Sequence, residues 1–217
     1  MLTYYNVEEK IISYVELLKN KYHVNFNYLI CTWSEYIEYI YNQKYQYFCE
    51  TKEELCDSIL DDSYLYNNTF IFSIYFSDFK NVIHTIIIPK ENIIKLLYQI
   101  LTKYKDKLND EIIYQYIELT LQHELGHILY INSLIDTYGI SEAFSYIEKQ
   151  ESLDIEKYNN QLNSLDENIS EYEYQRACLY KYYSMQKEYN ANKIMNIDVD
   201  NFIEFELYIR FGLTKNG

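Results

Sequence analysis

The sequence has very little glycine and proline, with four glycines and one proline among 217 residues. Glycine supplies the left-handed backbone of tight turns, and proline fixes loops and the edges of sheets, so folds made of many short strands are rich in both. Their scarcity argues against a β-sandwich and against long irregular loops. Because 48% of the residues are hydrophobic, the chain can still bury a sizeable core. We therefore expect a mainly helical protein.

Cysteine is scarce, long apolar runs are absent, and no basic and apolar leader opens the sequence. The four cysteines, Cys31, Cys49, Cys56 and Cys178, show no Cys-x-x-Cys spacing, which favours free thiols in a reducing compartment. No apolar run approaches the roughly 18 residues that a membrane-spanning helix needs. These features predict a cytoplasmic protein without a membrane partner.

Basic residues are also few compared with acidic ones. The chain has 19 Lys and Arg against 33 Asp and Glu, which gives a formal net charge of −14. Negative charge repels phosphate backbones and anionic headgroups, so binding to nucleic acid or to an anionic membrane is not expected. The charge suits a basic protein partner, or it serves solubility alone.

Hydrophobic periodicity predicts alternating helices and strands in the first half of the chain. The expected elements are helices over 3–19, 33–43 and about 53–60, a strand over 24–30, and a hairpin of strands at 70–76 and 82–88. Pro89 ends the hairpin and begins a helix whose apolar face includes Ile93, Ile94 and Leu97. One small sheet beside many helices predicts the α+β class.

The second half of the chain has only helical patterns. The expected helices cover about 110–132, 142–150 with Ser141 as its cap, 171–195, and a last stretch around 202–209 that Gly212 closes. Apolar residues from Ile155 to Tyr172 follow the spacing of the seam of a helical hairpin or of a short coiled coil. Ser170 and Glu173 form the spacing of a capping box, which marks the start of the helix that runs to about 195. With no linker or repeat visible, we expect a single domain over 1–217.

One motif stands out from this background, the His-Glu-x-x-His run from His123 to His127. On a helix, residues four apart lie on the same face one turn from each other, so both imidazoles can bind one Zn²⁺. Glu124 lies between them in the sequence and can reach a water bound to the metal. Gly126 has a cost inside a helix, which suggests close packing of a neighbouring element.

A catalytic zinc of this kind needs a third protein ligand and leaves a fourth position for water. A third histidine just downstream is excluded, because Tyr130 and Ser133 occupy the relevant positions. A carboxylate on a later helix is the alternative, and Glu188 is the best candidate. Other acidic residues lie nearby in the sequence and stay open as ligands: Asp166, Glu167, Glu171 and Glu173.

The run His-Glu-Leu-Gly-His together with Glu188-x-x-Ala191-Asn192 resembles the gluzincin metallopeptidases, most of all the ImmA/IrrE-type members. This resemblance implies a helix-rich, zincin-like fold with a sheet of about three strands packed on the active-site helix. It also implies that Glu188 binds zinc, that Asn192 steadies a histidine ligand, and that the small Ala191 lets the two metal-bearing helices approach. Glu188 follows His127 by 61 residues (188 − 127), which would fit a helical insertion at about 134–169.

The chemistry that follows is hydrolysis of a peptide bond in a protein substrate, with one Zn²⁺ per chain. Glu124 would act as general base towards a zinc-bound water. A further donor is expected to stabilise the oxyanion, and Tyr182, Tyr183, Tyr189 and His84 are candidates. A buried strand histidine is the preferred interpretation of His84.

A second hypothesis keeps the fold but not the catalysis. In it, the chain is an acidic interaction protein that binds a basic protein partner, with its metal structural or absent. Acidic side chains gathered on one surface would favour this alternative, and an open zinc site with an accessible Glu124 would favour the hydrolase.

Overall fold

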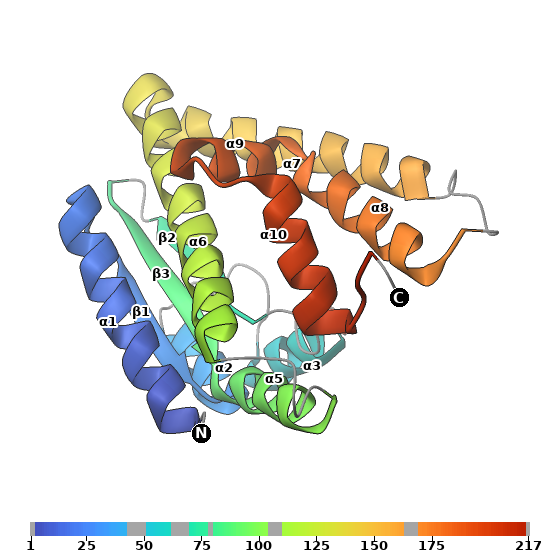
Figure 1. Cartoon of the computed structure of the whole chain (residues 1–217). Helices are drawn as coiled ribbons and strands as arrows, with labels where there is room; N and C mark the ends of the chain where they lie inside the picture. Colours follow the sequence, from blue (N-terminus) through green and yellow to red (C-terminus); the bar gives the residue numbers. More distant parts are fainter. Residues whose placement is uncertain are drawn as a thin grey trace. The chain divides into compact units, whose positions relative to one another are not determined.

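The computed structural model describes residues 3–42, 51–61, 70–77, 80–103, 110–162 and 169–215. The chain forms two compact units, residues 1–107 and 108–217, which we call the N-terminal and the C-terminal unit (Figure 1). The prediction of an α+β protein is confirmed, because the described residues are mainly helical and include a three-stranded mixed sheet. The single domain, the zincin-like fold and the packing of the sheet on the active-site helix stay predictions.

The N-terminal unit contains the sheet, and its strands and helices alternate along the chain. Its elements are α1 (Tyr4–Tyr22), β1 (Asn27–Cys31), α2 (Trp33–Asn42), α3 (Lys52–Asp61), β2 (Phe72–Ser77), β3 (Val82–Pro89) and α5 (Lys90–Lys103). In the sheet, β3 is the central strand, with β1 parallel to it and β2 antiparallel. The predicted hairpin is confirmed by the pairing of Tyr75 with His84.

Two details of this unit differ from the prediction. The first strand begins at Asn27 and not at residue 24, because its pairing with β3 starts at Asn27 opposite Thr85, although Phe26 is buried just before it. On α5, Ile93 and Leu97 are buried as expected, but Ile94 is 55% exposed. The buried stripe of α5 includes Leu96 instead.

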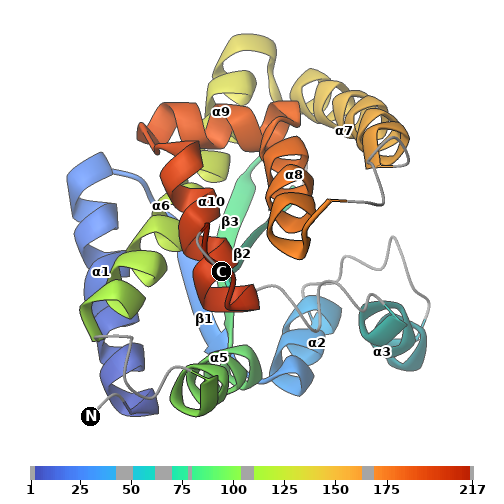
Figure 2. The ribbon, with the colours of Figure 1, turned by 45° about the vertical axis from the view of Figure 1, so that its right-hand side comes forward.

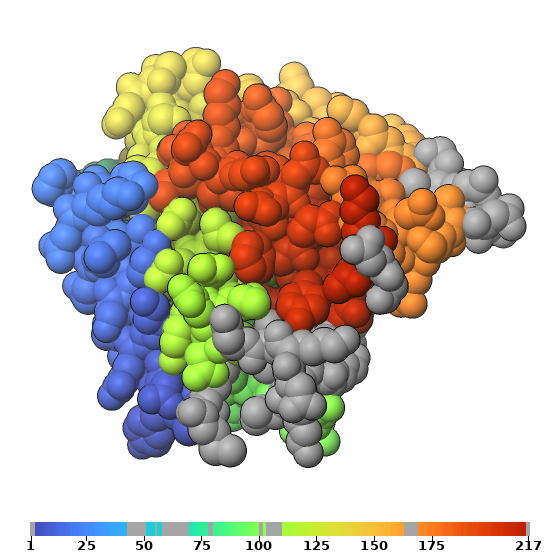
Figure 3. Space-filling view, viewed as in Figure 1, coloured from blue at the N-terminus to red at the C-terminus, as the bar shows by residue number. Residues whose placement is uncertain are grey.

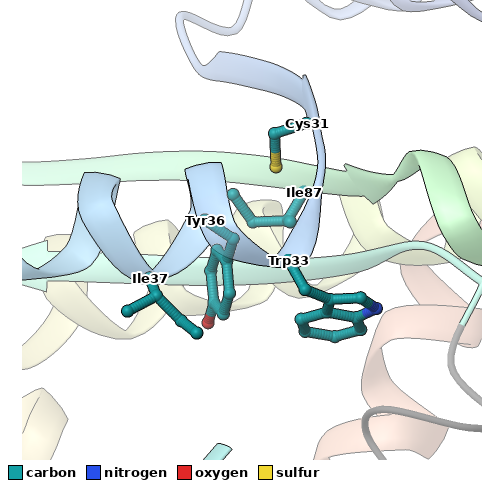
Figure 4. Packing of buried hydrophobic residues seen from close by; sticks show 5 residues of the cluster. All are labelled: Cys31, Trp33, Tyr36, Ile37 and Ile87. Carbon is teal, nitrogen blue, oxygen red and sulfur yellow. The ribbon is translucent and has the colours of Figure 1, made fainter. Parts of the chain in front are cut away.

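One part of the core of the N-terminal unit lies between α2 and one face of the sheet. Cys31, Trp33, Tyr36, Ile37 and Ile87 form a buried cluster there (Figure 4). The Trp33 ring stacks on Phe72 at a centroid distance of 6.1 Å, and Tyr36 meets the same ring edge-on at 5.4 Å. These aromatic contacts attach α2 to the edge strand β2.

Over the described residues, the secondary-structure elements of the C-terminal unit are all helices. Its elements are α6 (Asp110–Tyr138), α7 (Ile140–Leu162), α8 (Glu171–Tyr183), α9 (Gln186–Met195), α10 (Val199–Glu206) and a π-helical turn (Leu207–Phe211). α9 crosses α6, and α7 and α8 lie beside α9 (Figures 1 and 2). In the space-filling view, the atoms of α9 lie across α6, and those of α10 lie beside it (Figure 3).

Some predicted helix ends are confirmed. The Ser170 side chain accepts from the backbone N–H of Glu173, whose own side chain accepts from the backbone of Ser170, so the predicted capping box is present. Gly212 ends the last helical stretch with φ of 75°, a left-handed conformation that glycine adopts without steric cost.

Other predictions for this unit are wrong. Ser141 does not cap a helix, because α7 has already begun at Ile140, after Gly139. The same helix continues to Leu162 and leaves Ile155 54% exposed, so Ile155 is no part of a buried seam. The predicted helix over 171–195 is two helices, α8 and α9. The segment predicted to be an insertion, about 134–169, contains α7 and also residues 163–168, which lie outside the described residues. That this segment is an insertion stays a prediction.

Candidate metal centre

Helix α6 carries the His-Glu-x-x-His run, as the spacing predicts. His123 and His127 are each 5% exposed, and their rings meet edge-on with centroids 4.6 Å apart. The Nε2 atoms of the two rings lie 3.1 Å from each other. One turn of helix has therefore brought two imidazole nitrogens to one point in the interior of the C-terminal unit.

Helix α9 brings Glu188 to the same point. Its carboxylate oxygen Oε2 lies 2.9 Å from Nε2 of His123 and 3.3 Å from Nε2 of His127, and the residue is 5% exposed. Among the residues that the structure describes, these three form the group of histidine, cysteine and acidic side chains able to hold a metal ion. Glu171 and Glu173, the described alternatives for the third ligand, are not part of it. The other two alternatives, Asp166 and Glu167, lie outside the described residues.

The spacing of the three atoms fits a tetrahedral metal site. Two ligand atoms held 2.0–2.1 Å from one zinc ion at the tetrahedral angle lie roughly 3.3–3.4 Å apart. The three distances between His123, His127 and Glu188 range from 2.9 to 3.3 Å, close to that value. Small outward shifts of each side chain would make the fit complete.

The tautomer of His123 explains why the group of His123, His127 and Glu188 is suited to bind a cation. Its Nδ1 lies 2.8 Å from Oδ1 of Asn192, so Nδ1–H donates to the amide oxygen, and in the neutral ring Nε2 keeps its lone pair. That lone pair meets the carboxylate oxygen of Glu188, which accepts no hydrogen bond of normal geometry and is buried. Two acceptors at this distance repel each other unless a metal ion or a proton lies between them.

The pKa values of His123 and Glu188 also indicate that the group favours positive charge. Burial lowers the pKa of His123, but the contact with the Glu188 carboxylate outweighs it, and the pKa rises to about 9. Burial alone would raise the pKa of Glu188, yet His127 and His123 hold it well below its usual value. A divalent cation supplies the charge that a proton supplies in its absence.

Asn192 and Gly126 support this group from α9 and α6. Asn192 is 1% exposed and orients the His123 ring, as the resemblance implied. Gly126 faces the backbone of Ala191, and a Cβ on Gly126 would lie 2.4 Å from the Ala191 carbonyl oxygen. Only a residue without a side chain permits this approach, so the predicted packing role of Gly126 is confirmed. The close approach lets Glu188 reach the two histidines.

Glu124 is 7% exposed and follows His123 directly on α6. Its negative charge is one of the causes that raise the pKa of His123, so its carboxylate lies near that ring. Glu124 itself is not one of the three residues of the metal group.

The candidate oxyanion donors have different surroundings. Tyr183 is 5% exposed, and its ring meets that of His123 edge-on at 5.6 Å. Tyr182 meets the Tyr183 ring at 5.2 Å. Tyr189 is 52% exposed and lies under the ammonium group of Lys193, which disfavours it. His84 belongs to β3 of the N-terminal unit and is 4% exposed, so the interpretation as a buried strand histidine is confirmed.

Sequence reasoning missed that Phe202 packs against the rings of His123 and Tyr183. Phe202 of α10 lies 5.7 Å from the His123 ring and 5.3 Å from the Tyr183 ring. Next to it, the hydroxyl of the buried Tyr116 donates to the buried carboxylate of Glu206, which also accepts from Arg210. Tyr116 precedes His123 by seven residues, two helical turns, so its place on the same face of α6 was a usable signal.

Comparisons with models of known protein families, with curated proteins and with solved structures give no match to this chain. None of the described helices combines the length and the apolar character that crossing a membrane requires.

Proposed function

We propose that the chain is a zinc-dependent metallopeptidase that binds one zinc ion per chain and hydrolyses peptide bonds in a protein substrate. The observation that carries this proposal is the buried group of His123, His127 and Glu188, with the three ligand atoms at the spacing of a tetrahedral site. Two neutral imidazoles and one carboxylate form a donor set that catalytic zinc uses in hydrolases. The cytoplasmic location and the absence of nucleic-acid and membrane partners stay predictions of the sequence.

Bound zinc would supply a water with a pKa near 7 and a Lewis acid for the substrate carbonyl. Glu124 would accept the proton of the attacking water and return it to the nitrogen of the leaving amine. Asn192 would hold His123 in the tautomer that keeps Nε2 free for the metal. Each of these roles belongs to a buried side chain of α6 or α9.

Tyr183 is the candidate that we propose as hydrogen-bond donor to the oxyanion. Burial, helped by the negative charge of Glu206 and by Tyr182, raises its pKa well above the usual value. Its hydroxyl therefore keeps its proton at neutral pH and can donate. Its ring contact with His123 places Tyr183 beside the metal group.

Changing Tyr183→Phe is expected to lower kcat about 100-fold, the usual loss when one oxyanion donor is removed, and to leave zinc content unchanged. Steady-state kinetics on one cleaved peptide measure this, with Tyr180→Phe on the exposed face of α8 as the control. A Tyr183→Phe protein with wild-type kcat would exclude Tyr183 from the chemistry.

The metal content of the purified protein tests the proposal most directly. We expect about one zinc per chain in the wild type and less than a tenth of that in His123→Ala and in Glu188→Ala, because two remaining ligands bind zinc weakly. His23→Asn and Glu156→Ala alter exposed residues of the same types and serve as controls. The zinc-loaded protein is then incubated with a defined library of unstructured peptides, and new termini are identified by mass spectrometry.

Each result of this test has a meaning. No stoichiometric metal in the wild type after growth with zinc would contradict the proposal and leave the acidic interaction protein. Zinc lost in His123→Ala but kept in Glu188→Ala would move the third ligand to another residue. Stoichiometric zinc without any cleaved peptide would contradict the hydrolase and leave a structural metal.

A further inference from the structure

Helix α9 carries Glu188 in its first turn but has no cap of its own. Its N-cap residue is Met185, whose side chain makes no capping hydrogen bond. In contrast, α1, α8 and α10 are each capped by the side chain of the residue before them: Thr3, Ser170 and Asp198. The first N–H groups of a helix need acceptors, so α9 depends on an acceptor from elsewhere.

Helix α7 supplies that acceptor. Oδ2 of Asp154 accepts from the backbone N–H of Gln186, the first residue of α9, at 2.8 Å. The other carboxylate oxygen accepts from the side chain of Gln150 at 3.1 Å, which orients the group. A carboxylate at this place also meets the positive end of the α9 dipole. Asp154 therefore acts as the N-cap of α9 from a different helix.

Two more contacts join the same turn of α9 to the same face of α7. Oε1 of Glu151 lies 2.7 Å from the ammonium of Lys187, and the Tyr146 hydroxyl accepts from the side chain of Gln186 at 3.4 Å. Tyr146 and Asp154 are eight residues apart and Glu151 lies between them, so all three point to one side of α7. We call Tyr146, Glu151 and Asp154 the α7 clamp.

We propose that the α7 clamp positions the third metal ligand, an inference that rests on the proposed zinc site. The clamp binds Gln186 and Lys187, the two residues directly before Glu188. An uncapped first turn frays, and Glu188 would move with it away from the two histidines of α6. Asp154 and its neighbours are thus positioning residues, which act on the metal through the backbone of α9.

The test compares Asp154→Ala with Asp154→Asn, because asparagine is as good an N-cap as aspartate. We expect Asp154→Ala to weaken zinc affinity about tenfold, in the range of other residues that orient metal ligands, and Asp154→Asn to restore it to within about threefold. Glu156→Ala, an acidic residue on the exposed face of the same helix, should bind zinc as the wild type does. Affinity is measured by competition with a chromophoric chelator, and the visible spectrum of the cobalt-substituted protein reports the coordination.

Hydrogen exchange of the metal-free protein provides a readout that does not depend on zinc. Asp154→Ala should raise the exchange rate of the amides in the first turn of α9 about tenfold, while those in the middle of α6 keep their protection. Gln150→Ala keeps the Asp154 carboxylate but removes the hydrogen bond that orients it. This variant should produce a smaller change in the same direction, and it replaces Asp154→Ala in the test if Asp154→Ala does not fold.

Unchanged exchange in α9, or zinc affinity in Asp154→Ala equal to the wild type, would overturn the clamp. An equal loss of affinity in Asp154→Ala and Glu156→Ala would overturn it as well, because the effect would then be general to α7. A wild type that binds no zinc would contradict the proposed function, whereas the exchange experiment would still decide whether Asp154 caps α9.

Discussion

Glu124→Gln is expected to keep about one zinc per chain and to lower the rate of peptide hydrolysis by about 10²–10⁴-fold, the usual contribution of a general base. Glutamine has nearly the shape of glutamate but cannot accept the proton of the attacking water. Because Glu124 is not a member of the metal group, its substitution should leave the three ligands in place. The measurement is kcat/KM on one peptide at equal zinc occupancy.

The matched control for this variant is Glu111→Gln, the same chemical change at an exposed position of α6. It should retain wild-type activity. Full activity in zinc-loaded Glu124→Gln would exclude Glu124 as the base. Loss of zinc in this variant would assign Glu124 a role in holding the metal group.

Gly126→Ala is expected to destabilise the protein, although alanine favours an exposed helix over glycine by about 1 kcal/mol. The added methyl group would lie 2.4 Å from the carbonyl oxygen of Ala191 and 2.8 Å from its carbonyl carbon, so α6 and α9 must separate. We expect a free energy of unfolding lower by roughly 1–3 kcal/mol, as for other overpacked sites, together with weaker zinc binding. Denaturant unfolding in the presence of a chelator measures the loss without the contribution of the metal.

The double variant Gly126→Ala with Ala191→Gly separates two explanations of that loss. The atoms of Ala191 in close approach belong to its backbone, so removal of the Ala191 side chain should not restore stability. Recovery in the double variant would show that the alanine methyl group sets the helix distance. A single variant as stable as the wild type would contradict the close approach of the two backbones.

The metal group was predictable because its information is local. His123 and His127 need only the helical repeat to converge, and the sequence around them is strongly helical. Glu188 was not predictable from the residues alone, since several acidic residues follow α6; its selection rested on the pattern that it shares with Ala191 and Asn192. The close approach at Gly126 was expected because an interior glycine needs a packing reason.

The break between α8 and α9 had no local signal. Ser184 and Met185 are neither glycine nor proline, and apolar residues continue on both sides. The break is stable because Asp154, more than 30 residues away in the chain, caps the new helix. Such a contact belongs to tertiary structure, and periodicity cannot report it. The exposure of Ile94 and Ile155 has the same origin, because propensity does not specify which side of a helix has a neighbour.

The crossing of α6 by α9 at Gly126 also has a consequence for the order of events during synthesis. Until Glu188 has left the ribosome, the nascent chain has two histidines, an uncovered glycine and no third ligand. Docking of α9 then brings the Glu188 carboxylate to two buried imidazoles, a group that needs a proton or a metal ion among its acceptor atoms. At the proposed site, a zinc ion captured at that moment would take the place of the proton and stabilise the docked helix, so that metal supply would be coupled to maturation of the newly made chain.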